Sequence, residues 1–304
     1  MLSVCIPVYN YDVRTLIKTI AEQISKLQVP AEIICIDDCS TEECQKQNYE
    51  VCNKYGRYII LNENIGRTRI RNKLASLANF PWLLFLDCDL GIPSKFFIRS
   101  YIEIIEKFRY PVVCGGLMYQ KDPPSRNQRL RWRYGIKKES IPLSKRLKNP
   151  NKSFMTSNFL VNKQVFQSIL FDERLSVYGH EDTLFGYNLM KENILVFHID
   201  NPVVHLAIDD NVTFLNKTRH SIDNLLHILQ FENFDRDFIE DVTILKTYYS
   251  LKKYFLHQIV TSLYFIFSPL LLLYFRHQGR SLTLFAFFKL GYLSKKMKLI
   301  LNKT

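Results

Sequence analysis

The chain has 304 residues, of which 47% are apolar and 23% charged, enough for one large domain or two smaller ones with a core each. This composition excludes intrinsic disorder, and only 10 glycines and 11 prolines exclude a collagen-like or linker-like chain. A net charge of +12 indicates an anionic partner: nucleic acid, an acidic membrane or a phosphorylated small molecule. The seven cysteines are an odd number, which argues against a disulfide framework and indicates a reducing compartment. They include no C-x-x-C pair, so zinc is disfavoured.

The first part of the sequence alternates short apolar runs with amphipathic stretches. Strands are expected at 2–8, 32–36, 58–61, 82–86 and 111–114. Helices are expected at 15–27, 42–55, 67–77 and 95–108. This alternation predicts an α/β fold, with a mostly parallel sheet and helices on both of its faces.

Residues 120–152 break this pattern because they are rich in Lys and Arg, and we expect a basic, mobile loop there. Regular structure is predicted to resume afterwards. Strands are expected at 154–161 and 194–198, and helices at 164–170, 181–192 and 214–231.

The C-terminal part favours contact with a membrane. No acidic residue follows Asp241, residues 259–275 carry no charge, and residues 276–304 carry seven Lys or Arg side chains. Such a pattern is typical of a helix that lies on or enters an anionic leaflet. Pro269 inside the apolar run makes a shallow or re-entrant helix as plausible as a span. The alternative is a buried core helix with a solvated basic end.

Two acidic motifs are expected at one edge of the predicted sheet. Asp87 and Asp89 follow the strand 82–86, and at that edge they could hold Mg²⁺ or Mn²⁺ that bridges a diphosphate. Asp37 and Asp38 follow the strand 32–36, where a carboxylate can accept hydrogen bonds from a base or a ribose. The alternatives are an ordinary acidic turn and a helix N-cap. No G-x-G-x-x-G accompanies the first strand, so a dinucleotide site is disfavoured and a mononucleotide remains open.

Five segments in chain order resemble family 2 glycosyltransferases of the GT-A fold. They are VCIPVYN at 4–10, DDCST at 37–41, ENIG at 63–66 with Arg71-Asn72, LDCD at 86–89, and FDER at 171–174 leading into GHED at 179–182. The later motifs TSN at 156–158 and GHEDTLFGY at 179–187 are also similar to the transferase domains of chondroitin-polymerase-like enzymes. The matches span roughly the first 210 residues.

The resemblance implies a role for particular residues. The donor would be bound by Pro7, Tyr9, Asn10, Asp37, Asp38, Asn64, Gly66, Arg71 and Asp87, with Asp38 holding the uracil. Asp89 would bind Mn²⁺ or Mg²⁺, and His205 stands where related enzymes add a histidine ligand. A structural histidine is the alternative for His205, and His198 is the less favoured substitute.

Glu181 and Asp182 begin a predicted helix, where acidic residues are also favoured by the helix dipole alone. The resemblance implies that Asp182 is the general base and that Glu181 binds the acceptor or orients Asp182. Trp132, Asn158 and His180 are predicted to bind the acceptor.

The basic loop lies where this family builds its acceptor site. It is therefore predicted to bind a lipid diphosphate or an anionic glycan, although Trp132 and Tyr134 could also stack on nucleic-acid bases, and a merely solvated loop is possible. Of these, nucleic acid is disfavoured.

The sequence and the resemblance together predict an inverting, metal-dependent hexosyltransferase. It would transfer sugar from a UDP-linked donor to a growing, lipid-linked cell-surface glycan, on the cytoplasmic face of the inner membrane. The alternative is a non-catalytic module that binds a nucleotide-sugar or a glycan. The expected parts are a nucleotide-sugar half at 1–118, an acceptor half at 119–210, a helical extension at 211–250 and membrane-associated helices at 251–304.

Overall fold

The structure is a computed structural model that describes residues 1–175 and 178–301. It divides into two compact units. The sheet unit consists of Met1–Gln120, Glu139–Ser176 and Glu181–Ala207. The helical unit consists of Lys121–Lys138, Val177–His180 and Ile208–Thr304.

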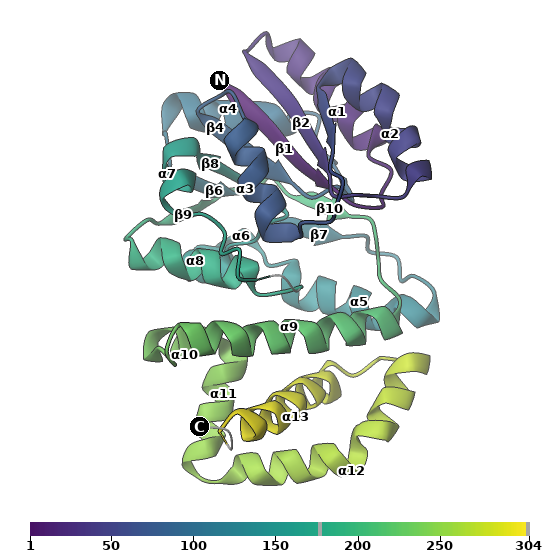
Figure 1. Cartoon of the computed structure of the whole chain (residues 1–304), viewed down its shortest axis with the longest axis vertical. Coiled ribbons are helices and arrows are strands. Elements are labelled where there is room, and N and C mark those ends of the chain that lie inside the picture. The colour runs from purple at the N-terminus through teal and green to yellow at the C-terminus, as the bar shows by residue number, and fades with distance from the viewer. Residues whose placement is uncertain (176–177, 302–304) are drawn as a thin grey trace. The chain divides into compact units, whose positions relative to one another are not determined.

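A seven-stranded sheet forms the centre of the sheet unit (Figure 1). Its strands, in spatial order, are β3 (Arg57–Ile60), β2 (Ala31–Asp37), β1 (Leu2–Val8), β4 (Trp82–Leu86), β8 (Asn158–Asn162), β6 (Val112–Cys114) and β9 (Val196–His198). All neighbouring pairs are parallel except those of β8, which runs antiparallel to both β4 and β6. The predicted mostly parallel sheet is therefore confirmed, with β8 reversed inside it. Strands β1 and β4 are apolar on both faces, as expected when helices cover both sides.

Helices bury each face of this sheet. The helices of the unit are α1 (Arg14–Leu27), α2 (Glu42–Tyr55), α3 (Arg67–Leu77), α4 (Phe97–Lys107), α6 (Leu143–Arg146), α7 (Lys163–Ser168) and α8 (Glu181–Lys191). On one face α1 and α4 join a core cluster through Ile17 and Phe97. On the other face α3, α7 and α8 join a second cluster through Leu74, Phe166 and Phe185. The sheet is thus the middle layer of three. Because most of its strands are parallel, their carboxyl ends lie at one edge.

A second, three-stranded sheet lies beside that edge. It contains β5 (Leu90–Gly91), β10 (Val203–His205) and β7 (Leu117–Tyr119), in that order. His205 pairs antiparallel with Leu90 and parallel with Tyr119. This register brings a residue from late in the chain beside the segment that follows β4.

The helical unit is built from two separate stretches of chain. Its helices are η1 (Arg126–Gln128), α5 (Arg129–Tyr134), α9 (Asn211–Phe231), α10 (Arg236–Asp241), α11 (Thr243–Lys253), α12 (Leu256–His277) and α13 (Leu282–Leu301). Leu130 of α5, Phe214 of α9, Phe275 of α12 and Phe285 of α13 share one apolar core. Within the described residues, α12 is the one helix long and apolar enough to cross a membrane, judged by length and composition alone. The most apolar window of α12 is only 17% buried, which does not fit the alternative of a buried core helix.

The expectation of a mobile basic loop at 120–152 is wrong, because most of this segment is helical. In addition to α5 and α6 it contains η1, the π-helical turn η2 (Gly135–Glu139) and η3 (Asn151–Ser153). The side chain of Leu130 is fully buried, and so is nearly all of Arg146. The Arg146 guanidinium donates to the carbonyls of Cys114, Gly115 and Ile199, which are the ends of the neighbouring sheet segments. Arg146 therefore anchors the segment instead of facing water.

We predict that Asn158→Ala lowers the free energy of unfolding by about 2–4 kcal/mol, because buried polar groups would lose their partners. Asn158 is 0% exposed; its side chain accepts from the Tyr101 hydroxyl at 2.6 Å and donates to the carbonyls of Gly116 and Asn201. Tyr101→Phe removes one of these bonds and should cost about 1–2 kcal/mol in the same urea titration. Equal losses in the two variants would contradict the assigned role of Asn158.

Candidate active site

The loops after β1 and β2 are tied to each other at the carboxyl edge of the sheet. The Asn10 amide donates to the Ser40 hydroxyl at 2.8 Å, and the Asn10 side-chain oxygen accepts from the Thr41 amide at 2.9 Å. Asn10 has a φ of 47°, in the left-handed region that asparagine tolerates better than most residues. Tyr9 beside it is 53% exposed, and Pro7 is half-buried. Tyr9 and Asn10 are thus both exposed, and of the two the Asn10 side chain already bonds to Thr41.

The two carboxylates after β2 hold the backbone. Asp37 is 0% exposed and accepts from the Ser40 amide at 2.7 Å and the Tyr58 hydroxyl at 2.6 Å. Asp38 accepts from the amides of Ile65 and Gly66, one at each carboxylate oxygen, at 2.7 and 3.0 Å. Burial raises the pKa of Asp38, and these two hydrogen bonds counteract part of that rise.

These bonds shape the turn before α3. Gly66 has a φ of 83°, which only glycine adopts without strain, and it is the residue before the first turn of the helix. The Asn64 side chain donates to the Asp38 carbonyl at 3.1 Å and is otherwise exposed. The predicted donor residues after β2 and β3 are therefore adjacent to one another.

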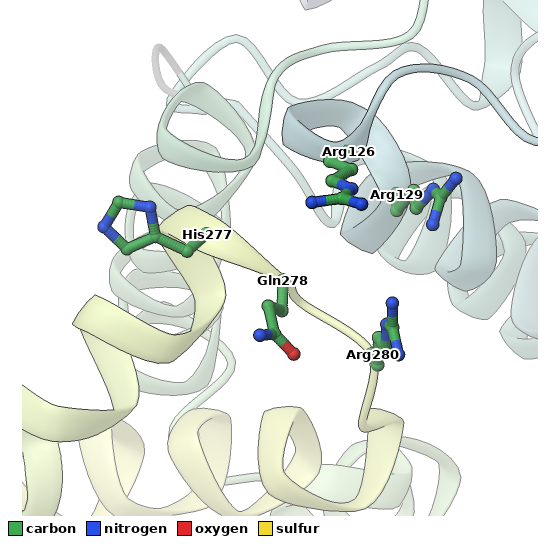
Figure 2. A pocket seen from close by; sticks show the side chains of 5 residues that line it. All are labelled: Arg126, Arg129, His277, Gln278 and Arg280. Atoms are coloured by element: carbon green, nitrogen blue, oxygen red, sulfur yellow. The ribbon is translucent and has the colours of Figure 1, made fainter.

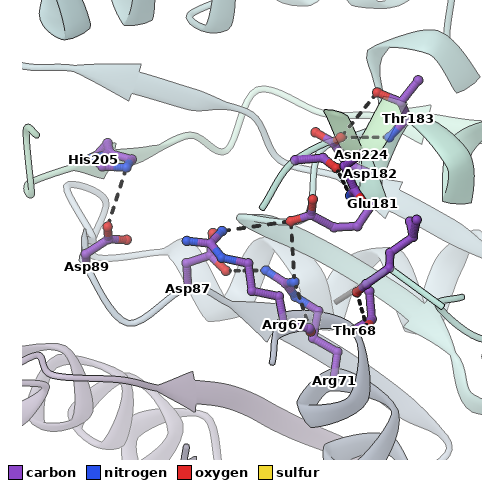
Figure 3. Close-up of polar contacts among 12 residues, drawn as sticks. Arg67, Thr68, Arg71, Asp87, Asp89, Glu181, Asp182, Thr183, His205 and Asn224 are labelled. Carbon is purple, nitrogen blue, oxygen red and sulfur yellow. Dashed lines mark hydrogen bonds and ion pairs between the residues drawn. The ribbon is translucent and has the colours of Figure 1, made fainter. Parts of the chain in front are cut away.

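A buried guanidinium stands between the next two acidic motifs (Figure 3). Arg71 of α3 is 2% exposed and donates to Asp87, which follows β4, at 2.7 Å. Its Nη1 also lies 3.9 Å from Glu181 Oε1, and Nη1 of the exposed Arg67 lies 3.8 Å from the same oxygen. Burial opposes ionisation of Asp87, but the charges of Arg71 and Arg67 outweigh it and lower the pKa of that carboxyl.

Asp89 and His205 form a pair at the edge of the small sheet. Asp89 Oδ2 lies 3.5 Å from His205 Nε2, although the two residues are far apart in sequence (Figure 3). The His205 ring stacks on the ring of Tyr119, with centroids 5.2 Å apart, and within the described residues its buried Nδ1 has no hydrogen-bond partner. Stacking therefore sets the orientation of the imidazole. Burial raises the pKa of Asp89, and the negative charge of Asp87 adds to this effect.

Asp182, in the first turn of α8, carries the most perturbed carboxyl at this edge. Its Oδ1 accepts from the Thr183 amide and hydroxyl at 2.7 and 3.3 Å, and in the part of the chain that the structure describes Oδ2 has no partner. Burial, and after it the charge of Glu181, raises the pKa of Asp182 to about 7. A carboxylate with such a pKa and an available oxygen is suited to accept a proton near neutral pH.

The structure brings together most, but not all, of the residues predicted to form the site. The donor, metal and base candidates all lie in the sheet unit, at the carboxyl ends of its strands or on α3 and α8. Asn158 is in the same unit, but its amide is fully buried and bonded, so the expected contact with an acceptor does not fit its position. Trp132 and His180 belong to the helical unit, and their acceptor role remains a prediction.

Two contributors were absent from the sequence prediction. Arg67 lies one helical turn before Arg71 and close to Glu181. The i, i+4 spacing of the two arginines after Gly66 could have indicated that both lie on the same face of the helix. Tyr119 stacks on His205, and no pattern in the sequence indicated it because the contact depends on strand β7, which has only three residues.

Comparisons with known proteins identify the family and the fold. The sequence pattern of the family described as "Glycosyl transferase family 2" matches residues 3–170, more than half of the chain. The chain belongs to glycosyl transferase family 2. The predicted enzyme class, a glycosyltransferase, and the predicted GT-A fold are thereby confirmed. No match was found among the curated proteins.

Solved structures resemble this family 2 glycosyltransferase in fold at low sequence identity. A mannosyltransferase from Pyrobaculum calidifontis, in complex with GDP-Man and Mn²⁺, has a TM-score of 0.53 and 11% identity. The match covers 75% of this chain and 64% of that one, so the chain spans less than two thirds of this neighbour. S. aureus TarS 1–349 has a TM-score of 0.51 and 16% identity, over 97% of this chain and 91% of that one.

A third structural neighbour is glucosyl-3-phosphoglycerate synthase from Mycobacterium tuberculosis, in complex with Mn²⁺, UDP and glucosyl-3-phosphoglycerate. It has a TM-score of 0.52 and 16% identity, over 75% of this chain and 79% of that one. At such identities the likeness establishes the fold.

We predict that Asp182→Asn is more stable than the wild-type glycosyltransferase at pH 8. The folded pKa of Asp182, about 7, is above the value of about 3.9 in an unfolded chain, so the folded state binds the proton more tightly. The stability that this contributes is fully present below about pH 4 and is lost as the pH rises through about 7. Because asparagine stays neutral, the gap between variant and wild type should grow from about pH 4 to 7 and then level off.

Urea unfolding at a series of pH values measures this gap. Glu106→Gln, at an exposed position of α4, corrects for the loss of one negative charge. A gap that does not change with pH would contradict the raised pKa of Asp182.

Proposed function

We propose that this protein is an inverting, metal-dependent glycosyltransferase that uses a UDP-linked sugar. One observation carries the proposal: four carboxylates lie at one edge of the sheet. Arg71 contacts two of them, Asp87 and Glu181. Asp89 lies two residues after Asp87, and Asp182 directly follows Glu181. Open α/β sheets bind their ligands at this edge. A nucleotide, a cation and a base would therefore meet in one place.

The donor would lie over the loops that follow β1, β2 and β3. Tyr9 offers an exposed ring for stacking on a base, and Asn64 an exposed amide. Asp38 uses one lone pair of each oxygen on the backbone, which leaves others to accept from the uracil N–H. Two structural neighbours of this chain, those from S. aureus and M. tuberculosis, are known as UDP complexes, which is compatible with this choice.

Asp89 and His205 are the residues that would hold Mn²⁺ or Mg²⁺. They fit a cation because a carboxylate oxygen and an imidazole nitrogen stand 3.5 Å apart, and both are ligand types of divalent metals. No group of three such ligands occurs among the described residues, so donor oxygens and water would complete the coordination. When bound, such a cation offsets the negative charge of the departing diphosphate.

The residues of α3 and α8 would carry out the transfer. Asp182 Oδ2 takes the proton of an acceptor hydroxyl while that oxygen forms a bond to the anomeric carbon and the bond from this carbon to the diphosphate breaks. A single displacement of this kind inverts the configuration. Arg71 and Arg67 lie within 4 Å of Glu181, beside Asp182, and add positive charge near the leaving group.

The acceptor would be a hydroxyl of a growing, lipid-linked cell-surface glycan, at the cytoplasmic face of the inner membrane. The exposed apolar surface of α12 supports a membrane, as do the ten Lys and Arg residues after Asp241, a stretch without any acidic residue. The seven free cysteines support a reducing compartment. We keep the four parts expected from the sequence as a proposal about roles, in which residues 119–210, for example, form the half that binds the acceptor.

The first test addresses the base. Asp182→Asn should lower the rate of UDP release with sugar acceptor by roughly 10²-fold or more, with little change in UDP binding by calorimetry, because a positioned proton acceptor is lost. Wild-type kcat should fall as the pH drops through about 7, where Asp182 becomes protonated. Glu181→Gln should cost less. If Glu181→Gln reduces turnover more than Asp182→Asn while both variants are folded, the two roles are reversed.

The second test addresses the metal. A panel of UDP-sugars should show UDP release that EDTA abolishes and Mn²⁺ restores, and Asp89→Ala should lower turnover roughly 10²-fold. His205→Ala should raise the Mn²⁺ concentration needed for half-maximal binding by roughly tenfold or more. Glu106→Ala serves as a matched control, since it removes an exposed carboxylate of α4. Full activity of Asp89→Ala would contradict the metal role.

A further inference from the structure

Three arginines line one cavity of the helical unit. The cavity has a volume of about 340 Å³ and is bordered by Arg126, Arg129, His277, Gln278 and Arg280 (Figure 2). Arg126 and Arg129 come from η1 and the start of α5, and the other three residues come from the end of α12 and the turn after it. This volume is at the lower end of the range for small-molecule sites and exceeds what a single phosphate group needs.

No carboxylate neutralises these arginines. Throughout residues 1–175 and 178–301, the side chains of Arg126 and Arg280 form no ion pair, and Arg129 makes only a long hydrogen bond to the Pro124 carbonyl at 3.4 Å. Three guanidinium groups around one cavity attract an anion that enters between them. Arginine also matches the oxygens of a phosphate group in geometry.

The walls of the cavity are held in place by buried contacts. Asn211 is 1% exposed; its side chain accepts from the Leu130 amide at 3.0 Å and donates to the Phe275 carbonyl at 2.9 Å. It thereby joins α5 to the end of α12. Gly279 has a φ of 51°, and a Cβ there would meet the Leu130 Cβ at 2.7 Å. The backbone that carries the lining side chains is therefore held in place, which lowers the entropic cost of binding a ligand.

An apolar stripe on α12 leads to this cavity. Ile259, Leu263, Ile266, Leu270 and Leu273 follow one another at steps of three or four residues and are each between 40% and 64% exposed. One further step of four reaches His277, a wall of the cavity. At 3.6 residues per turn all six positions fall on one face of the helix. Pro269 lies inside α12, and Figure 1 shows the helix bending.

We infer that the helical unit binds the phosphate headgroup of a membrane lipid in this cavity, while the apolar stripe of α12 contacts the acyl region. An apolar surface that ends in an unneutralised cationic pocket matches the two ends of an anionic amphiphile. Nucleic acid or free phosphate would use the arginines but leave the stripe exposed to water. This inference deepens the proposed function because it rests on the membrane-borne acceptor and names the lipid chemistry that holds the enzyme beside it.

The test uses the full chain and phosphatidylcholine vesicles with or without phosphatidic acid, at physiological salt. The pocket variant is Arg126→Gln/Arg129→Gln/Arg280→Gln. We expect it to bind phosphatidic-acid vesicles roughly 10²-fold more weakly than wild type in co-sedimentation.

Two further variants separate the contributions of charge and apolar contact. Lys253→Gln/Lys295→Gln/Lys298→Gln removes three exposed charges outside the pocket and should weaken vesicle binding by less than about tenfold. Ile266→Gln/Leu270→Gln should make the remaining binding sensitive to salt, because apolar burial does not weaken with ionic strength.

Each outcome decides between the possible ligands. A larger loss in the pocket variant than in the lysine variant, with the same pyrophosphate binding by calorimetry in the pocket variant and wild type, supports a lipid headgroup. Equal losses mean diffuse attraction and overturn the inference. Pyrophosphate binding that the pocket variant abolishes, with unchanged vesicle binding, would assign the cavity to a soluble phosphate compound and also overturn it. So would dimerisation that depends on the α12 stripe in sedimentation experiments without vesicles.

A failure of the proposed glycosyl transfer can be distinguished from a failure of the lipid site. UDP release with a soluble sugar acceptor uses the sheet unit and is measured in detergent without vesicles. If that activity is absent while the pocket variant still loses vesicle binding, the proposed reaction fails and the lipid site stands.

Discussion

Charge compensation around the buried guanidinium of Arg71 is the constraint on which the site depends. A buried charge without a partner is costly, and Arg71, at 2% exposure, needs carboxylates close by. Asp87 supplies one from the end of β4, and Glu181 supplies another from the start of α8. Strand, helix α3 and helix α8 are thereby held at one edge through a single side chain. The position of Asp182 follows, because it is the next residue after Glu181.

This arrangement leaves the carboxylates of the site with different tasks. Asp87 is paired with Arg71, so its pKa is lowered and it stays ionised. Asp182 has no arginine partner among the described residues and lies beside Glu181, so burial and that neighbouring charge raise its pKa to about 7. Carboxylates with different environments can serve different chemical roles at the same pH. The pairing that stabilises the edge therefore also leaves one carboxylate available to take up a proton.

Much of this edge could be predicted from the sequence. The apolar runs of β1, β2 and β4 and the acidic residues directly after them have a strong local signal, because strand burial and strand ends are visible in the pattern. The contact of Asp89 with His205 was implied only by resemblance. It depends on the pairing of β5 and β10, which have two and three residues and are too short for periodicity to reveal.

The errors have a common physical cause. The basic segment 120–152 was expected to be a mobile loop because charged residues are usually solvated, yet Arg146 is buried against backbone carbonyls and Leu130 enters the core of the helical unit. Asn158 was expected to bind an acceptor, but it satisfies the polar groups of Tyr101, Gly116 and Asn201 inside the sheet unit. In each case a polar side chain is used to pair buried backbone or hydroxyl groups. Sequence alone does not distinguish such a residue from one that binds a ligand, because both need the same donors and acceptors.

The arginines of the sheet edge and those of the cavity differ in their partners. In the sheet unit Arg71 and Arg67 lie close to carboxylates, so the positive charge at that edge is already compensated within the protein. In the helical unit Arg126 and Arg280 have no carboxylate partner within the described residues, and no acidic residue follows Asp241 in the sequence. Because Arg126 and Arg280 form no ion pair within the described residues, an anion could bind to them without breaking one. The proposed association with an anionic surface through this unit would therefore leave the charge pairs of the sheet unit intact. The proposed membrane binding and the proposed chemistry at the sheet edge would use separate sets of interactions.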